Sequence, residues 1–382
     1  MKKVVLASFA KFPEGDSNAV HFLNIGSIFS ELGYDVSFVG FGERDLNNSF
    51  GKVYSLNRSI QSNLISKVRN HLHMDSKLLQ FLFKNYADAD VVIIAACLSK
   101  QSLNKLQKFY SKHSPKTQLL LSMTEMYTRD EFDNYNYFVK RGFKRNQFLN
   151  TTFNNKYYKV ICISKFLKEN FDKRGFKTLY LPFVFSNKYI GKLQKAEHDK
   201  INYLYAGSPD NKDMLLDIVR AFSELSDENK NKIALKIVGV NKEWFEKRDS
   251  SLIKKVSSFI TFCGRVPREE ISRFYIDADY SLLLRDENKL FVKAGCPTKI
   301  IESLFYGVPP VTNLFGDLPD FLYDSENSII ANGHSISEFK EAIIKSINNY
   351  DLHEKLSKNA LKTANSVFEV SNYTVPMKEF LK

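Results

Sequence analysis

A lysine follows a short turn between a strand-like run and a helical segment. The turn is Ala206-Gly207-Ser208-Pro209-Asp210-Asn211-Lys212, and we expect it to join a strand at 201–207 to a helix at 212–225. A lysine is disfavoured in the first turn of a helix, because the N-terminal end of the helix dipole is positive. An anion bound at the same place would offset that repulsion. The segment therefore predicts a diphosphate site formed by Lys212, Ser208 and neighbouring backbone amides.

A second group of polar residues leads to one glutamate. In chain order the group contains Arg285, Lys293, Ala294, Gly295, Pro297, Thr298 and Glu302. Proline favours the start of a helix, so Glu302 is expected one turn into a helix, four residues after Thr298. A carboxylate placed there suits paired hydrogen bonds to vicinal hydroxyls, such as those of a ribose.

Glu125 directly follows the expected strand at 118–124. Ligands bind parallel sheets at the carboxyl ends of their strands, so Glu125 is expected at a binding edge. A carboxylate there can stabilise developing positive charge or accept a proton. A surface glutamate that caps the next helix is the alternative.

The loop after the first expected strand contains Gly15 and Asp16, and Ser17 or Asn18 can cap the helix that follows. The glycine lets backbone amides approach a ligand at the positive end of that helix. The spacing matches neither the Walker loop nor G-x-G-x-x-G. A plain capped turn explains the residues equally well.

The positive charge of the chain is unevenly distributed. Lys and Arg number 55 against 43 Asp and Glu, a net charge of +12, and residues 1–185 hold 27 basic and 15 acidic residues while 186–382 hold 28 of each. Such an excess attracts polyanions or anionic membrane surfaces. Lys140, Arg141, Lys144 and Arg145 lie among aromatic residues, which is typical of a membrane-surface patch. A solvated loop is the alternative, and no nucleic-acid-binding motif is present.

Several functional classes are disfavoured by composition. The seven histidines show no metal-ligand spacing, so we expect no metal site. The four cysteines are far apart and are expected to be free thiols. No apolar run approaches the roughly 20 residues of a membrane helix, and the N-terminus does not read as a signal peptide. These features predict a cytoplasmic chain.

Short apolar runs alternate with segments of helical period along the whole chain. The expected strands are 4–9, 36–41, 91–97, 118–124, 160–164, 179–183, 201–207, 233–240, 259–263, 280–284, 310–312 and 328–331. The expected helices are 18–32, 100–112, 165–173, 212–225, 268–277, 298–306 and 336–348. This alternation predicts two α/β domains with doubly wound parallel sheets. We place them at 1–185 and 186–364, with the polar linker at 186–200, a C-terminal helix near 365–382 that returns to the first domain, and the site in the cleft between them.

Together these segments resemble the retaining, nucleotide-sugar-dependent glycosyltransferases with the GT-B fold. The most specific part is 278–311, which reads A-D-x-x-L-L-x-R, then P-T-K-x-x-E-x-x-x-x-G-x-P-x-V. The preceding Phe262-Cys263-Gly264-Arg265-Val266-Pro267 and the earlier Val160-Ile161-Cys162-Ile163-Ser164 also match. Thr124-Glu125-Met126-Tyr127 is similar to a T-E-W-Y variant of bacterial surface-polysaccharide members.

The resemblance implies roles for individual residues. Glu302 corresponds to the glutamate that holds the nucleotide ribose, and Lys212 to the basic residue on the donor diphosphate. Residues near the base, the diphosphate and the sugar are implied to be Gly264, Arg265, Val266, Arg285, Ser208, Thr298, Gly15 and Asp16.

Three positions depart from the family pattern. A second glutamate that grips the donor sugar is replaced by Ala294, so Glu125 or the backbone amides of residues 293–295 are expected to hold the sugar instead. A histidine that often ends the strand is replaced by Thr124-Glu125. An arginine near the diphosphate is replaced by Ser208, and Arg285 or Arg265 is expected to substitute.

The implied reaction is transfer of a sugar from a nucleotide-diphosphate donor to a glycan or polyprenyl-diphosphate-linked acceptor, with retention and without a metal or other cofactor. Glu125, Lys212 and Glu302 are the implied catalytic residues, and the four basic residues near 140 are implied to hold the acceptor at an anionic membrane surface. Two alternatives stand beside this hypothesis: a catalytically inactive GT-B subunit that acts as a binding partner, and a sugar-nucleotide epimerase. The epimerase would need more acid and base side chains than the sequence offers.

Overall fold

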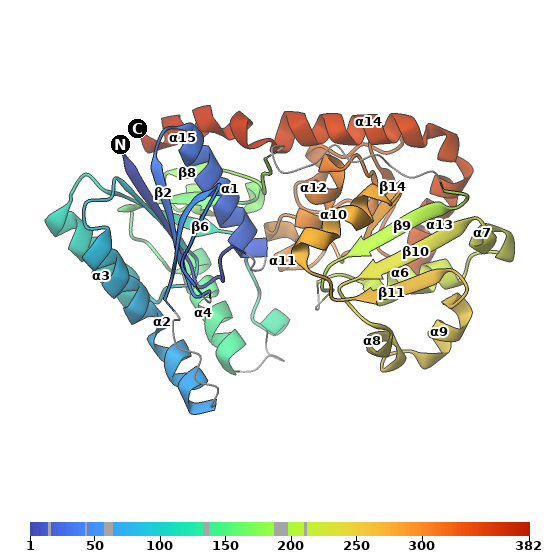
Figure 1. The fold of residues 1–382 in the computed structure, drawn as a ribbon, viewed down its shortest axis with the longest axis horizontal. Coiled ribbons are helices and arrows are strands. Elements are labelled where there is room, and N and C mark those ends of the chain that lie inside the picture. Colours follow the sequence, from blue (N-terminus) through green and yellow to red (C-terminus); the bar gives the residue numbers. More distant parts are fainter. Residues whose placement is uncertain (14–16, 43, 57–63, 133–136, 187–197, 210–211) are drawn as a thin grey trace. The chain divides into compact units, whose positions relative to one another are not determined.

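The computed structural model describes residues 1–13, 17–42, 44–56, 64–132, 137–186, 198–209 and 212–382. The chain divides into two compact units. The first comprises residues 1–186, 294–296 and 370–382, and the second comprises 187–293 and 297–369. Each unit has a sheet of parallel strands covered by helices, which confirms the prediction of two Rossmann-like α/β domains (Figure 1).

The sheet of the first unit has eight strands in the order β3-β4-β2-β1-β5-β6-β7-β8. The strands are β1 (Lys3–Ala7), β2 (Asp35–Gly40), β3 (Leu46–Asn48), β4 (Gly51–Ser55), β5 (Val91–Ala95), β6 (Gln118–Met123), β7 (Tyr158–Cys162) and β8 (Thr178–Tyr180). All described neighbours pair in parallel except β3 and β4. Strands such as β5 are buried along their whole length, because helices cover both faces of a parallel sheet.

Helices lie on both faces of this sheet. They are α1 (Ser17–Glu31), α2 (Leu64–Asn85), α3 (Lys100–His113), α4 (Tyr137–Thr151), α5 (Lys165–Asp172) and α15 (Thr374–Leu381). Helix α1 lies on one face of the sheet, and α2 and α3 lie on the other, as Figure 1 shows. The C-terminal α15 packs against α1, and the side chains of Gln118 and Lys159 donate to the carbonyls of Leu381 and Phe380.

The sheet of the second unit has six strands in the order β11-β10-β9-β12-β13-β14. The strands are β9 (Ile201–Ala206), β10 (Ile233–Val238), β11 (Ile260–Gly264), β12 (Tyr280–Leu283), β13 (Pro310–Asn313) and β14 (Ile329–Ala331). This is the 3-2-1-4-5-6 order of dinucleotide-binding folds, whose strand order reverses between the first and fourth strands. Here that switch point lies between β9 and β12.

The helices of the second unit also cover both faces of its sheet. They are α6 (Leu215–Ser223), α7 (Asp227–Asn231), α8 (Lys242–Glu246), α9 (Ser250–Val256), α10 (Arg268–Ile276), α11 (Leu290–Ala294), α12 (Thr298–Phe305), α13 (Ile336–Asn348) and α14 (His353–Thr363). One face is the larger core, where α6, α9 and α13 bury residues such as Phe222, Val256 and Ile343. The other face carries α10 and a smaller core around Tyr275.

The local structure differs from the expected elements in several places. Strands β3 and β4 and helix α2 were not expected, and the alternative of a solvated loop for the basic residues near 140 is wrong, because they lie on helix α4. Helix α6 begins at Leu215, three residues after Lys212. Much of the expected linker, residues 187–197, lies outside the described residues. Within the described part of the chain, no helix is both long and apolar enough to cross a membrane.

Candidate functional site

The turns after β9 and β12 meet at the switch point of the second sheet. The Met214 amide donates to the Leu284 carbonyl at 2.9 Å, and the Arg285 Nε donates to the Asp213 Oδ1 at 2.8 Å. Both turns leave the carboxyl ends of their strands, the edge where doubly wound sheets bind ligands. The fold therefore places Arg285, a predicted donor-binding residue, beside the turn that carries Lys212.

Lys299, one turn before Glu302 on α12, joins the same group. Its ammonium group pairs with Asp213 and donates to the Tyr205 hydroxyl at 3.0 Å and the Ser208 carbonyl at 3.3 Å. Gly207 is required here, because it has a φ of +135° and an added Cβ would overlap the Lys299 side chain. Sequence analysis did not identify Lys299 or Asp213 as site residues. The sequence feature that could have indicated them is the lysine of Pro297-Thr298-Lys299 together with the Gly207 turn after β9.

Asp213 is almost completely buried, with a side chain 1% exposed. Burial alone would raise the pKa of the Asp213 carboxyl, but Arg285 and Lys299 outweigh this effect and hold its pKa at about 2. The carboxylate is thus charged throughout the physiological range. One buried anion faces two cations, so the group retains positive charge at the edge of the sheet.

Lys212 lies in the turn after β9, half-buried, and its amide donates to the Pro209 carbonyl at 3.2 Å. The expectation that it occupies the first turn of a helix is wrong, because α6 begins at Leu215. The dipole argument for an anion at Lys212 therefore fails. The cations that the structure brings together are Arg285 and Lys299, on turn and helix segments adjacent to Lys212.

Glu302 lies on α12, one turn after Thr298, as predicted. Its side chain is 19% exposed. Burial raises the pKa of its carboxyl above the ordinary 4.5, while Arg268 and Lys299 act in the opposite direction. The Arg268 guanidinium lies 3.3 Å from the Glu302 Oε1. Lys299 thus acts on both Glu302 and Asp213. This supports one ligand-binding edge formed by helix α12 and the turn after β9.

The remaining predicted donor residues fall in different places. Gly264, Arg265 and Val266 lie at the carboxyl end of β11, where Gly264 has a φ of +64°. Gly15 and Asp16 lie outside the described residues.

The backbone of residues 293–295 offers less to a sugar than expected. The Lys293 amide donates to the Lys289 carbonyl at 3.1 Å within α11, so the expectation that this amide holds the donor sugar is wrong. Ala294 and Gly295 group with the first unit, in which the Ser164 hydroxyl donates to the Ala294 carbonyl at 2.7 Å.

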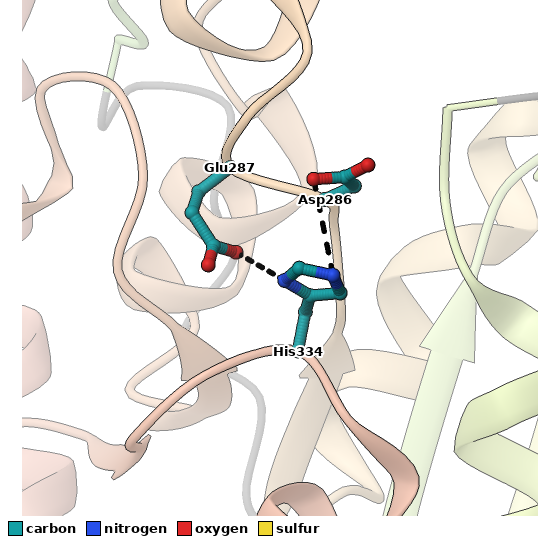
Figure 2. A group of neighbouring side chains, drawn as sticks. All are labelled: Asp286, Glu287 and His334. Atoms are coloured by element: carbon teal, nitrogen blue, oxygen red, sulfur yellow. Dashed lines mark hydrogen bonds and ion pairs between the residues drawn. The ribbon is translucent and has the colours of Figure 1, made fainter.

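Among the described residues, one group has the composition of a metal site: Asp286, Glu287 and His334. Figure 2 shows the His334 ring between the two carboxylates, with Nδ1 2.7 Å from Glu287 and Nε2 3.9 Å from Asp286. The Asn313 side chain also donates to Glu287 at 2.9 Å. These residues could hold a cation, but each carboxylate already faces a nitrogen of the imidazole. Sequence spacing could not reveal the group, because 47 positions separate Glu287 from His334.

The first unit contains a cavity of about 280 Å³. Its lining residues follow β1, lie at and after the ends of β5 and β6, and belong to α1 and α4. Its lining includes Phe9, Cys97, Thr124, Glu125, Tyr127, Arg141, Phe143, Arg145 and Asn146. Glu125 therefore lines a pocket at the carboxyl edge of the sheet, where we expected it.

Hydrogen bonds fix the position of Glu125. Its Oε2 accepts from the Tyr127 hydroxyl at 2.5 Å. Its carbonyl accepts from the side chains of Asn146 and Asn150, at 2.9 and 3.1 Å. Both asparagines belong to α4, so this helix anchors the backbone that carries the carboxylate.

Helix α4 also carries the four predicted basic residues. Lys144 is exposed, Lys140 and Arg141 are half-buried, and Tyr137 and Val139 are 71% and 37% exposed. Arg145 differs, because its guanidinium lies 3.0 Å from Asp75 and donates to the Cys97 carbonyl at 2.7 Å. The prediction that Arg145 faces a membrane is wrong, since an internal carboxylate already neutralises it.

Comparison with known proteins finds similarity to glycosyltransferases. Residues 187–363 match the family described as Glycosyl transferases group 1. The chain is 23% identical over 238 residues to the uncharacterized glycosyltransferase MJ1069 of Methanocaldococcus jannaschii, which covers 58% of this chain and 57% of that protein. The chain thus spans just over half the length of the curated relatives that it matches.

Three solved structures show the same two-domain fold. Sucrose-phosphate synthase from Thermosynechococcus elongatus has a TM-score of 0.76 at 13% identity, covering 99% of this chain and 98% of that one. HepE of Anabaena in complex with UDP-glucose has a TM-score of 0.69 at 12% identity, covering 100% and 99%. WaaG, a glycosyltransferase involved in lipopolysaccharide biosynthesis, has a TM-score of 0.69 at 14% identity, covering 99% and 98%. The fold class is therefore that of the GT-B glycosyltransferases.

Proposed function

We propose that this protein is a retaining glycosyltransferase that moves a sugar from a nucleoside-diphosphate donor to a glycan or a polyprenyl-diphosphate-linked acceptor. The observation that carries the proposal is the group of Arg285, Lys299 and Asp213 at the switch point of the second sheet. It presents cations at the edge where such sheets bind ligands, next to Glu302. A catalytically inactive subunit is not favoured, because these cations and the acid are all present in the domain that matches the family.

In the proposed mechanism, the donor diphosphate binds to Lys212, Lys299 and Arg285. Glu302 accepts hydrogen bonds from the ribose hydroxyls. As the bond from the sugar to the diphosphate weakens, these cations stabilise the departing negative charge, so no metal is required. The acceptor hydroxyl attacks the face that the diphosphate leaves, and its proton passes to a phosphate oxygen or to Glu125.

The cellular role that we propose is the assembly of a bacterial surface polysaccharide, at the cytoplasmic side of the membrane. WaaG, which shares the fold, acts in lipopolysaccharide biosynthesis. The nucleotide sugar is supported by the UDP-glucose complex of HepE. The direct experiment is incubation with a panel of UDP-, GDP- and TDP-sugars in the presence of EDTA. Thermal stabilisation by one donor, its turnover, and retained anomeric configuration by NMR would support the proposal; no stabilisation and no turnover would refute it.

Glu302→Gln is expected to weaken donor binding about 10- to 100-fold, because hydrogen bonds to a charged acceptor are worth about 1.5–3 kcal/mol. Burial raises the pKa of the Glu302 carboxyl, so folding disfavours its charge relative to the unfolded chain. The neutral glutamine should therefore leave the melting temperature at pH 7 unchanged or higher. Calorimetric titration with the donor, with Glu269→Gln on α10 as the control, measures the effect. Equal donor affinity in wild type and Glu302→Gln would contradict the assignment.

The exposed face of α4 is proposed to bind an anionic membrane surface through Lys140, Lys144 and the exposed Tyr137. Wild-type protein should sediment with vesicles of phosphatidylcholine and phosphatidylglycerol, less so as salt is raised. The double change K140E/K144E should reduce sedimentation severalfold, whereas K254E/K255E on α9 should not. Equal sedimentation with purely neutral vesicles would count against the membrane surface.

A further inference from the structure

One cation in the cavity of the first unit, Arg141, has no ion-pair partner among the described residues, although the Glu125 carboxylate lines the same cavity. Arg141 is half-buried and lines the cavity. Across the described ranges of the chain, no carboxylate, carbonyl or ring contacts its guanidinium. Its neighbour one turn along the helix, Arg145, is instead neutralised by Asp75.

The charge of Arg141 is costly where it lies. Partial burial removes water from the guanidinium. An anionic ligand in the cavity would offset this cost, and a guanidinium binds carboxylate or phosphate through two parallel hydrogen bonds.

The rest of the lining is suited to a sugar ring. Phe9, Tyr127 and Phe143 supply apolar faces, and the Tyr127 and Phe143 rings lie 4.5 Å apart. Thr124 and Asn146 supply polar atoms. At about 280 Å³ the cavity is slightly smaller than the roughly 300–1,000 Å³ of drug-sized ligand sites, so it suits one sugar rather than an oligosaccharide.

We infer that this cavity binds the terminal sugar of the acceptor and that this sugar is acidic, with a carboxylate or phosphate held by Arg141. The inference rests on the proposed function for the identity of the ligand as an acceptor. Glu125 disfavours a second negative charge, so an uncharged part of the sugar must face it. That part offers a hydroxyl to the carboxylate, which is the contact that general-base catalysis requires.

Ligand-observed NMR titration tests the inference with three probes: D-glucuronate, glucose 6-phosphate and uncharged glucose. Wild-type protein should bind one or both acidic probes at least about 10-fold more tightly than glucose. The tighter acidic probe identifies the anion as carboxylate or phosphate. R141Q should lose this preference, with glucose binding unchanged. K105Q, at an exposed position of α3, should behave as wild type.

Equal binding of all three probes, no binding of any, or equal losses in K105Q and R141Q would each overturn the inference. The acidic-sugar test can fail without the donor-binding test failing, because the proposed donor site lies in the second unit. R141Q should retain full thermal stabilisation by the nucleotide sugar. If no donor binds to wild type while the acidic probes bind through Arg141, the glycosyltransferase proposal fails and the acidic-sugar site remains.

Discussion

Replacing Glu125 by glutamine is expected to lower kcat for sugar transfer by about 10²- to 10⁴-fold, the usual loss when a general base is removed. Glutamine keeps the length and shape of the side chain and loses only the ability to take up a proton or to oppose positive charge. Its amide oxygen can still accept the hydrogen bond from the Tyr127 hydroxyl. The backbone of residue 125 stays anchored by Asn146 and Asn150. The fold is therefore expected to be preserved.

The measurement is release of nucleoside diphosphate from the donor that the panel identifies, with and without acceptor. Glu125→Gln should bind the donor as tightly as wild type, because its Arg285 and Lys299 group is intact. The expected loss is thus in kcat rather than in donor Kd. Glu169→Gln, at an exposed position of α5, serves as the matched control. A kcat within threefold of wild type would show that a donor phosphate oxygen, not Glu125, takes the proton.

The sheets could be predicted from sequence because parallel strands are buried on both faces. Val91–Ala95 and Ile201–Ala206 are apolar runs of strand length, and both form strands at those positions. Edge strands lack this signal. Strand β4 buries only Val53 and Ser55 of its five residues and pairs with β3 at the edge of the sheet, so its composition did not stand out.

The site could be predicted in part. Glu125 follows a strand end, and Glu302 follows a helix start, so local rules place both. Asp213 was overlooked because its role depends on tertiary contacts. Its carboxylate pairs with Arg285 and Lys299, which are distant from it in the sequence. Lys212 was over-interpreted for the opposite reason, because a helix start was assigned three residues early. Arg145 likewise required knowledge of Asp75, 70 residues away in the sequence.

The second large effect is expected from Asp213→Asn, which should destabilise the second unit by about 3–5 kcal/mol. Removing one partner of a buried ion pair leaves the other charge uncompensated, and such losses fall in that range. Here two cations are left, with the side chains of Arg285 and Lys299 only 12% and 19% exposed. The depressed pKa of the Asp213 carboxyl has the same sign, since a fall from 3.8 to about 2 corresponds to about 2–3 kcal/mol.

Urea unfolding followed by tryptophan fluorescence measures this effect within the second unit. The chain has one tryptophan, Trp244, on α8, so the signal reports that unit. The control is Asp227→Asn, whose carboxylate is fully exposed and 3.8 Å from Lys230. Exposed pairs contribute about 0–1 kcal/mol, so the control should unfold nearly as wild type does.

The pH dependence separates the ion pair from a general packing defect. Because the folded pKa of Asp213 is depressed, its contribution is fully present above pH 4 and is lost as the pH falls through about 2. The difference in unfolding free energy between wild type and Asp213→Asn should therefore be constant from pH 7 to pH 4 and shrink below it. A difference that persists unchanged at pH 2 would assign the loss to packing. Equal unfolding free energies of wild type and Asp213→Asn at pH 7 would show that Asp213 does not stabilise the positions of Arg285 and Lys299. The proposed ion-pair group would then be wrong.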